Sequence, residues 1–399
     1  MSFLKRWGIQ AWFWPLLVST LVVYGGAILA APLLHDSDCS GHKFDYAGEW
    51  YANWDGQWYK YILLNGYDFD KNIPGAFGPK VFFPLYPLLG RLVYFFTSLK
   101  PEWCLLIVTW TALIGLCVVW ERYCRLRFPD DAARRQYAML LLLFWPAAFF
   151  LRVTYTESLF MLLIALLFYG FQKQWPMHRL ILVCALATAT RPTGIACAAA
   201  LCCYAWNSSP QRGARRGIYA LSAAIAGCAG LFAYMLYLWL SWNDPLLFLH
   251  QLQAWSRFAT YGGLTMPQRL EMLVTLKPLW SFFAMHPWTE SAISWHFQLL
   301  NQGTWTIAVL VVAAATVKRW LKPEEIIFAL ASLGMIYMTT GYRDMVSSGR
   351  YTLAVLPLYI GLARLLPQRN PTAIACLVAC LASLLFLYSG MFARWLCLN

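Results

Sequence analysis

Apolar residues form long runs along this chain, and charged residues gather in the short segments between them. A helix needs about 20 apolar residues to cross a bilayer. Five uncharged runs reach or approach that length: 7–34, 103–120, 192–211, 217–243 and 371–393. Shorter runs can cross if flanking side chains reach the interface, and these are 136–151, 158–171, 302–317, 326–342 and 351–363. The pattern predicts an all-α polytopic membrane protein with ten or eleven transmembrane helices, forming one domain over residues 1–399.

The composition agrees with this interpretation, since 60% of residues are hydrophobic, only 12% are charged and mean hydropathy is +0.52. The net charge of +13 does not indicate a nucleic-acid partner, because the basic residues lie in short segments between apolar runs. Cytoplasmic segments of membrane proteins carry such an excess of Lys and Arg. The segments expected in the cytoplasm contain Lys5 and Arg6, residues 122–135, Arg212 to Arg216, residues 318–322, and Arg369.

Two larger segments are expected on the opposite, extracytoplasmic side: a first outer loop over 35–102 and a second outer segment over 242–301. Residues 35–80 carry seven acids against four lysines, which makes them the most acidic part of the chain. Residues 81–98 are apolar but contain prolines and an arginine, so we expect a helix lying in the membrane interface. A crossing there would place the basic 122–135 segment outside.

The run at 179–206 borders expected cytoplasmic segments at both ends, so it cannot cross the membrane once. The motif TRPTG at 190–194 lies midway along it, and Pro192 and Gly194 can turn the chain there. Broken helices are tolerated where the backbone lines a polar cavity. We therefore predict two short helices joined at this motif.

The stretch EWYANWDGQWYKY at 49–61 places a central acid, Asp55, among aromatic residues. Trp54, Trp58, Tyr59 and Tyr61 have flat faces that suit a sugar ring or a lipid, and polar tips for hydrogen bonds. A carboxylate in such surroundings is a candidate general base. The alternative is a belt of Trp and Tyr at the membrane interface with a solvated acid among them.

Three charged residues, Arg152, Glu157 and Arg191, interrupt runs that are otherwise apolar. Ionisable groups in such positions are costly and usually face a cavity or a partner. They are therefore candidates for substrate binding. Arg152 and Glu157 are five residues apart near a helix end, so a mutual ion pair or simple snorkelling stays open as an alternative.

Two further arginines, Arg343 and Arg350, lie on the expected outer side, where the charge bias predicts few cations. The small residues 347–349 stand between them. Arginines so placed are typical of an anion-binding patch. The alternative is a surface pair of Arg343 with Asp344, with Arg350 at the start of a membrane helix.

Together these motifs resemble those of the PIG-V family, which contains the second mannosyltransferase of GPI-anchor synthesis and its prokaryotic relatives. The resemblance rests on WDGQWYKYILLNGYD with FFPLYPLLGRL, FWPAAFFLRVTYTESLF with TRPTG, GRYTLAVLPLY and, more weakly, NDPLLFLHQLQAW. The blocks follow the family order from residue 50 to residue 359.

The resemblance implies a membrane glycosyltransferase of the C superfamily (GT-C) that uses a polyprenyl-phosphate sugar as donor outside the cytoplasm. It implies a catalytic acid in the first outer loop, which matches Asp55, acting as base on the acceptor hydroxyl with inversion. Arg350, helped by Arg191 or Arg343, would stabilise the departing phosphate. The residues assigned to substrate binding are Trp54, Trp58, Tyr59, Arg152, Tyr155, Glu157, Arg191, Arg343, Arg350 and Tyr351.

On this interpretation the partners are a polyprenyl-phosphate sugar, a lipid-linked or glycan acceptor and membrane lipids, with no cofactor or metal expected. The chain is expected in the plasma membrane of a bacterium, or in the ER membrane if its source is eukaryotic. Mannose is inherited from the family name alone. Two other classes stay open: a transporter or flippase with the same intramembrane charges, and a non-catalytic subunit of a glycan-assembly complex that would not need Asp55.

Overall fold

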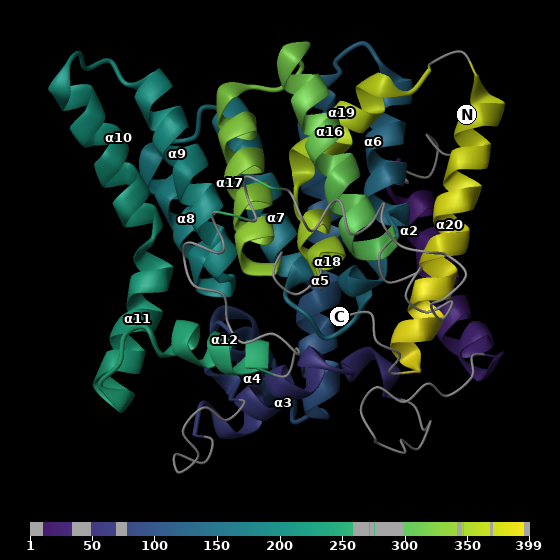
Figure 1. The fold of residues 1–399 in the computed structure, drawn as a ribbon, viewed down its shortest axis with the longest axis horizontal. Helices are drawn as coiled ribbons and strands as arrows, with labels where there is room; N and C mark the ends of the chain where they lie inside the picture. Colours follow the sequence, from purple (N-terminus) through teal and green to yellow (C-terminus); the bar gives the residue numbers. More distant parts are fainter. Residues whose placement is uncertain are drawn as a thin grey trace.

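The computed structural model of this chain describes residues 11–33, 49–68, 78–257, 299–340, 347–367 and 370–394, together with positions 271, 275 and 345. These residues form α-helices joined by short 3₁₀ or π turns, and no β-strand occurs among them. The fold is all-α, as the sequence predicts (Figure 1).

The helices up to the middle of the chain are α2 (Phe13–Gly25), α3 (Asp55–Asn65), α4 (Leu85–Thr97), α5 (Pro101–Arg127), α6 (Ala132–Phe144), α7 (Glu157–Gln172), α8 (Met177–Thr190) and α9 (Ile195–Ser208). They are followed by α10 (Ala214–Gly227), α11 (Ala229–Trp242), α12 (Leu247–Arg257), α16 (Thr304–Val317), α17 (Pro323–Thr340), α18 (Ser348–Leu353), α19 (Leu356–Leu365) and α20 (Pro371–Ala393). Short connecting helices include η4 (Pro79–Val81), η5 (Ala148–Arg152), η6 (Pro192–Gly194) and η7 (Leu299–Gly303).

The chain is a multi-pass membrane protein. Among the described residues, four helical segments are long and apolar enough to span a membrane: Phe13–Ala30, Pro101–Arg127, Leu299–Val317 and Thr372–Ala393. The helices α10 and α11 meet this condition only as a pair, bent by 52° where they join. The helices α7, α8 and α19 are apolar but shorter, so the total of ten or eleven crossings stays a prediction.

The two ends of the helix bundle differ in character, and the long helix α5 joins them (Figure 1). At one end, Arg127 donates hydrogen bonds to the backbone oxygen of Trp320 at 2.5 Å and to the Glu325 carboxylate at 3.0 Å. At the other end, Lys60 of α3 forms an ion pair with Glu102 in the first turn of α5. The basic segments at 122–135, 212–216 and 318–322 therefore lie opposite the aromatic first outer loop, as predicted, whereas Lys5, Arg6 and Arg369 lie outside the described residues. Which end faces the cytoplasm stays a prediction.

Parts of both expected outer segments pack against each other. The side chain of Gln251 in α12 accepts a hydrogen bond of 3.2 Å from the backbone N–H of Lys80 in η4. Tyr234 of α11 donates to the backbone oxygen of Lys80 at 2.7 Å. Figure 1 shows α3, α4 and α12 gathered at the lower end of the bundle. Apart from positions 271 and 275, residues 258–298 of the second segment lie outside the described residues.

Helix α4 presents apolar side chains outward, which suits the predicted interfacial helix. Phe95 and Phe96 are 77% and 74% exposed. Its other face packs on α5, where the Tyr86 hydroxyl donates to the backbone oxygen of Leu105 at 3.1 Å. Its place in the membrane interface stays a prediction.

The helices α8 and α9 form a hairpin that turns inside the bundle. Leu180, near the start of α8, lies against the last turn of α7. Tyr204, near the end of α9, stacks on Phe171 in that same turn, with ring centroids 4.4 Å apart. Between the two helices, Arg191 reaches Glu157 at the opposite end of α7. The chain therefore enters and leaves at one end of α7 and turns at the other, which confirms the break predicted at TRPTG.

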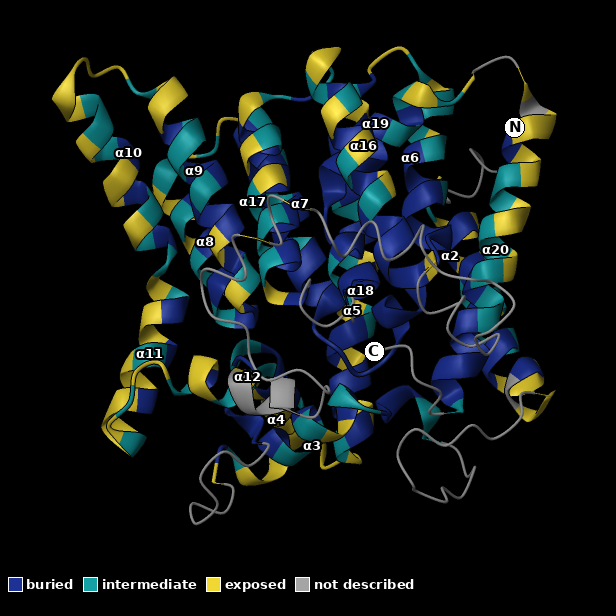
Figure 2. Cartoon of the chain, viewed as in Figure 1, coloured by how far each residue is buried: buried dark blue, intermediate teal, exposed yellow. Residues whose placement is uncertain are grey.

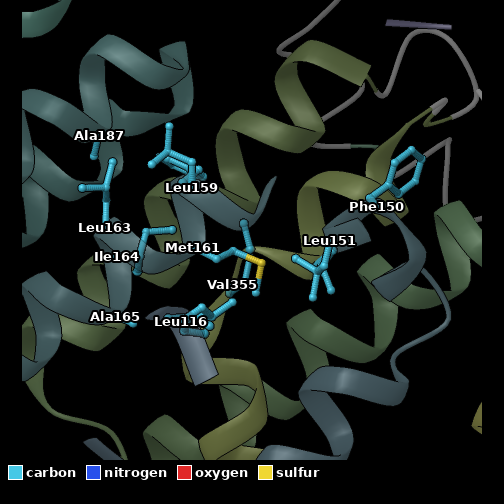
Figure 3. Packing of buried hydrophobic residues seen from close by; sticks show 14 of the residues in the cluster. Leu116, Phe150, Leu151, Leu159, Met161, Leu163, Ile164, Ala165, Ala187 and Val355 are labelled. Atoms are coloured by element: carbon cyan, nitrogen blue, oxygen red, sulfur yellow. The ribbon is translucent and has the colours of Figure 1, made fainter. Parts of the chain in front are cut away.

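The centre of the bundle is α7, which is apolar on almost every face and buried on almost every face (Figure 2). A helix that is hydrophobic all round belongs in a protein interior. Figure 3 shows Leu163 and Ile164 of α7 packed among other buried side chains, with Leu116 of α5 and Val355 of the α18–α19 connection nearby. This packing fixes the first residue of α7, Glu157, deep inside the molecule.

Candidate active site

Four charged side chains from four distant segments meet at the first turn of α7. Arg350 of α18 contacts the carboxylate of Asp55 through Nη1 and the carboxylate of Glu157 through Nε. Arg191, in the turn between α8 and α9, donates to the same Glu157 oxygen, Oε1, at 2.7 Å. These four residues, Asp55, Glu157, Arg191 and Arg350, are called the charge cluster below.

The charge cluster is buried, with one side open. The side chains of Glu157 and Arg350 are 0% and 5% exposed, whereas Asp55 is 19% exposed. Two acids balance two arginines, so the buried charges are compensated within the cluster. Asp55 is the member that a molecule from outside reaches most easily, because its side chain is the most exposed of the four.

The backbone before Asp55 makes an unusual turn. Trp54 has φ of 55° and ψ of −119°, although it is not glycine. Such conformations cost about 1–3 kcal/mol and persist only where the surroundings enforce them. One buried side chain bonds to both sides of this turn: the Tyr155 hydroxyl accepts from the backbone N–H of Asp55 and donates to the backbone oxygen of Asn53, both at 3.1 Å.

The aromatic residues around Asp55 are not equivalent. Tyr59 is only 3% exposed and packs edge-on against Phe82 and Tyr86, with centroid distances of 5.1 Å to each. Burial raises the pKa of the Tyr59 hydroxyl, which therefore stays protonated. Trp58 is half-buried and stacks on Phe82. Tyr59 is thus part of the core rather than an open face, while Trp54 and Trp58 remain partly exposed.

Both arginines of the cluster also lie over aromatic rings. The Arg350 guanidinium carbon is 4.3 Å from the ring centroid of Tyr155. The Arg191 guanidinium carbon is 4.9 Å from that of Tyr351. Cations in such positions are attracted to the ring faces. The structure thus brings Tyr155 and Tyr351 to the charge cluster, and their predicted role in substrate binding stays a prediction.

Arg152 lies apart from the cluster, which differs from its predicted place. It is fully buried, and it donates to the Thr20 hydroxyl of α2 at 3.1 Å and to the backbone oxygen of Ala148 at 2.9 Å. The alternative pair of Arg152 with Glu157 does not form either, because Glu157 takes both cluster arginines. Arg152 holds η5 against α2 instead. Arg343 lies outside the described residues, and so does its proposed pair with Asp344.

A small pocket of about 10 Å³ adjoins the charge cluster on the side of Arg191. Its polar lining comes from Arg191, Thr193, Ser332 and Tyr351, and the remaining lining is apolar. A second, almost wholly apolar pocket of about 180 Å³ lies among α6, η7, α16, α19 and α20. Within the described part of the chain, no three His, Cys, Asp or Glu side chains are grouped to hold a metal ion.

Comparisons with known proteins add little beyond the geometry. No protein-family model matches the sequence, and no curated protein matches it. Among solved structures, the oligosaccharyltransferase of Archaeoglobus fulgidus, tethered to an acceptor peptide containing the NVT sequon, aligns with a TM-score of 0.43 and 14% identity. The alignment covers 99% of this chain but 56% of that protein. The resemblance to the PIG-V family therefore stays a prediction.

Two further residues shape the site: Asn53, which the sequence analysis missed, and Gly349, one of the small residues noted between Arg343 and Arg350. Asn53 is buried, and its side-chain amide donates to the backbone oxygens of Phe392 at 3.1 Å and Ala393 at 3.3 Å, which ties the Asp55 turn to the end of α20. Gly349, beside Arg350, lies so close to Leu300 that an added Cβ would stand 2.2 Å from its backbone oxygen. A glycine directly before Arg350 indicates a close approach of the backbone there, whereas nothing in the sequence indicates a role for Asn53.

Proposed function

We propose that this protein is a GT-C glycosyltransferase that transfers a hexose from a polyprenyl phosphate to a lipid-linked or glycan acceptor on the extracytoplasmic face. Mannose is the sugar that the motif resemblance favours. The observation that carries the proposal is the contact between Asp55 and Arg350, which are 295 residues apart in the chain. This transfer requires a base for the acceptor hydroxyl and a cation for the leaving phosphate, and one side chain of each kind meets here.

In the proposed reaction, Asp55 takes the proton of the acceptor hydroxyl as its oxygen attacks the anomeric carbon of the donor. The bond between that carbon and the phosphate oxygen breaks, and polyprenyl phosphate leaves with the bonding electron pair. Attack opposite the leaving group inverts the configuration at the sugar carbon. The proton then passes from Asp55 to solvent, which its partial exposure allows.

Arg350 would have two partners in succession. Without a donor its guanidinium contacts the Asp55 carboxylate. A donor phosphate is also an anion suited to the planar fork of arginine, so it would compete with Asp55 for Arg350. Binding of the donor would then leave the Asp55 carboxylate free to act as base. The contact of Arg350 with Glu157 holds the arginine in place during this exchange.

The lipid part of the donor needs an apolar surface near the cluster. The apolar pocket among α6, η7, α16, α19 and α20 meets this need. It is bordered by Leu299 of η7, and two residues further on Asn301 accepts a hydrogen bond of 3.0 Å from the backbone N–H of Gly349, next to Arg350. A prenyl chain in this pocket would approach the phosphate-binding arginine along η7.

The test is transfer by the purified protein from radiolabelled polyprenyl-phosphate mannose to the lipid extract of a deletion strain, in which the acceptor should accumulate. Labelled product from the wild type, and its loss in Asp55→Asn, supports the proposal. Movement of the labelled lipid across a vesicle membrane without product would identify a transporter or flippase. Activity that survives Asp55→Asn would assign the chemistry to another residue.

A further inference from the structure

The turn at Trp54 places the Asp55 side chain, so whatever holds the turn controls the orientation of the carboxylate. Trp54 is a bulky residue in a conformation that side chains rarely adopt. Nothing within Trp54 itself favours that conformation, and the neighbouring groups must enforce it. The residues that bond directly on either side of Trp54 are the first candidates.

Tyr155 forms hydrogen bonds on both sides of Trp54 through its single hydroxyl group. Its oxygen accepts from the Asp55 N–H and its hydrogen is donated to the Asn53 carbonyl, which is possible because a hydroxyl is both donor and acceptor. The Asp55 N–H opens α3 and has no partner within that helix. The hydroxyl therefore bridges the residue before Trp54 to the residue after it.

The Tyr155 side chain that forms this bridge is held by buried surroundings. Tyr155 is fully buried, two residues before α7, and the adjacent Thr154 N–H donates to the backbone oxygen of Tyr51 at 2.8 Å. The same Tyr155 ring lies under Arg350. One side chain thus contacts both the turn that carries Asp55 and the arginine that pairs with Asp55.

We propose that Tyr155 is a positioning residue: its hydroxyl holds the Trp54 turn so that the Asp55 carboxylate faces Arg350 and the acceptor. The sequence had placed Tyr155 in substrate binding, but a fully buried side chain has no surface for a substrate. The catalytic part of this inference rests on the proposed function. The structural part, the bridge itself, is independent of it.

The variant that tests the bridge is Tyr155→Phe, which removes the hydroxyl and keeps the ring under Arg350. The matched control is Tyr234→Phe, because Tyr234 is also buried and its hydroxyl also donates to a backbone oxygen, that of Lys80. Tyr155→Phe loses two buried hydrogen bonds and Tyr234→Phe loses its bond to Lys80, so both variants should lose some stability, whereas only Tyr155→Phe affects the turn at Trp54.

Two measurements separate the possible outcomes. Hydrogen exchange of the peptide 49–60 in the purified full-length protein should rise in Tyr155→Phe and stay at the wild-type level in Tyr234→Phe. In the transfer assay, kcat of Tyr155→Phe should fall about ten- to a hundred-fold with little change in donor KM, since misplacing a catalytic group affects the chemical step.

Unchanged exchange in Tyr155→Phe would overturn the bridge, whatever the activity. Faster exchange with unchanged kcat would overturn the positioning role and leave only a structural one. If the wild-type protein transfers no sugar, the proposed function fails, and the exchange experiment still decides whether Tyr155 holds the turn.

Discussion

Arg191 donates a hydrogen bond of 2.7 Å to Glu157, and it does so on the same carboxylate oxygen that contacts Arg350. Glu157 is therefore shared by two arginines that would repel each other without it. The acid is fully buried, and no solvent screens the pairs from outside. This arrangement makes Glu157 the residue on which the charge cluster depends for its stability.

Replacing Glu157 with glutamine should destabilise the protein by about 3–5 kcal/mol, because it leaves two buried arginines without their shared partner. Thermal unfolding in detergent would measure the loss. Glu49→Gln is the control, since Glu49 is 40% exposed and pairs with Lys100, which is 73% exposed, and such pairs contribute about 0–1 kcal/mol. Equal unfolding temperatures for the two variants would show that Glu157 does not hold the cluster.

Replacing Asp55 with asparagine should lower the transfer rate by about a hundred- to ten-thousand-fold, which is the usual effect of losing a general base. Donor binding should persist, and it should strengthen if Asp55 and the phosphate compete for Arg350. Transfer rate and donor affinity on the purified variant measure both effects. A variant that keeps most of its rate would favour the interfacial aromatic belt with a solvated acid.

Replacing Arg350 with lysine keeps the positive charge but removes the planar fork that reaches Asp55 and Glu157 together. Losing a hydrogen bond to a charged group costs about 1.5–3 kcal/mol, which is roughly a ten- to hundred-fold loss of donor affinity. Donor titration would measure it. Unchanged affinity would place the phosphate elsewhere, with Arg191 as the next residue to test.

Replacing Arg152 with lysine should affect stability rather than donor binding, because Arg152 bonds to α2 and η5 and not to the charge cluster. We expect a lower unfolding temperature together with unchanged donor affinity. The same two measurements used for the other variants apply. A loss of donor affinity in Arg152→Lys would return this residue to the substrate-binding role that its position in the sequence had indicated.

The orientation of the protein in the membrane can be tested with two single cysteines at exposed positions, Lys100 and Ala132. They lie near opposite ends of the bundle, beside the two ends of α5. In a background lacking the accessible native cysteines, an impermeant thiol reagent should label position 100 from the extracytoplasmic side and position 132 only after permeabilisation. The reverse pattern would place the charge cluster at the cytoplasmic face.

The class of fold and much of its layout follow from the sequence alone. Long apolar runs predict membrane helices because an isolated backbone in lipid must satisfy its own hydrogen bonds. The break at Pro192 and Gly194, the separation of the basic segments from the first outer loop, and the choice of Asp55, Glu157, Arg191 and Arg350 as candidate residues could all be read from local patterns. Each of these features depends on neighbouring residues in the chain.

Which charged residues meet depends on the packing of helices that are distant in the chain. Arg152 and Glu157 are five residues apart, yet η5 ends at Arg152 and an extended residue, Val153, follows it before α7 begins, so the two side chains part. Arg350 instead reaches Asp55 and Glu157 because α3, α7 and α18 pack together at one end of the bundle. The hydrogen bonds of the Tyr155 hydroxyl with Asn53 and Asp55, which are distant in the chain, also depend on this packing. The periodicity of apolar residues indicates how a segment folds locally. Contacts between distant side chains depend instead on how the helices pack, and a single sequence does not reveal that packing.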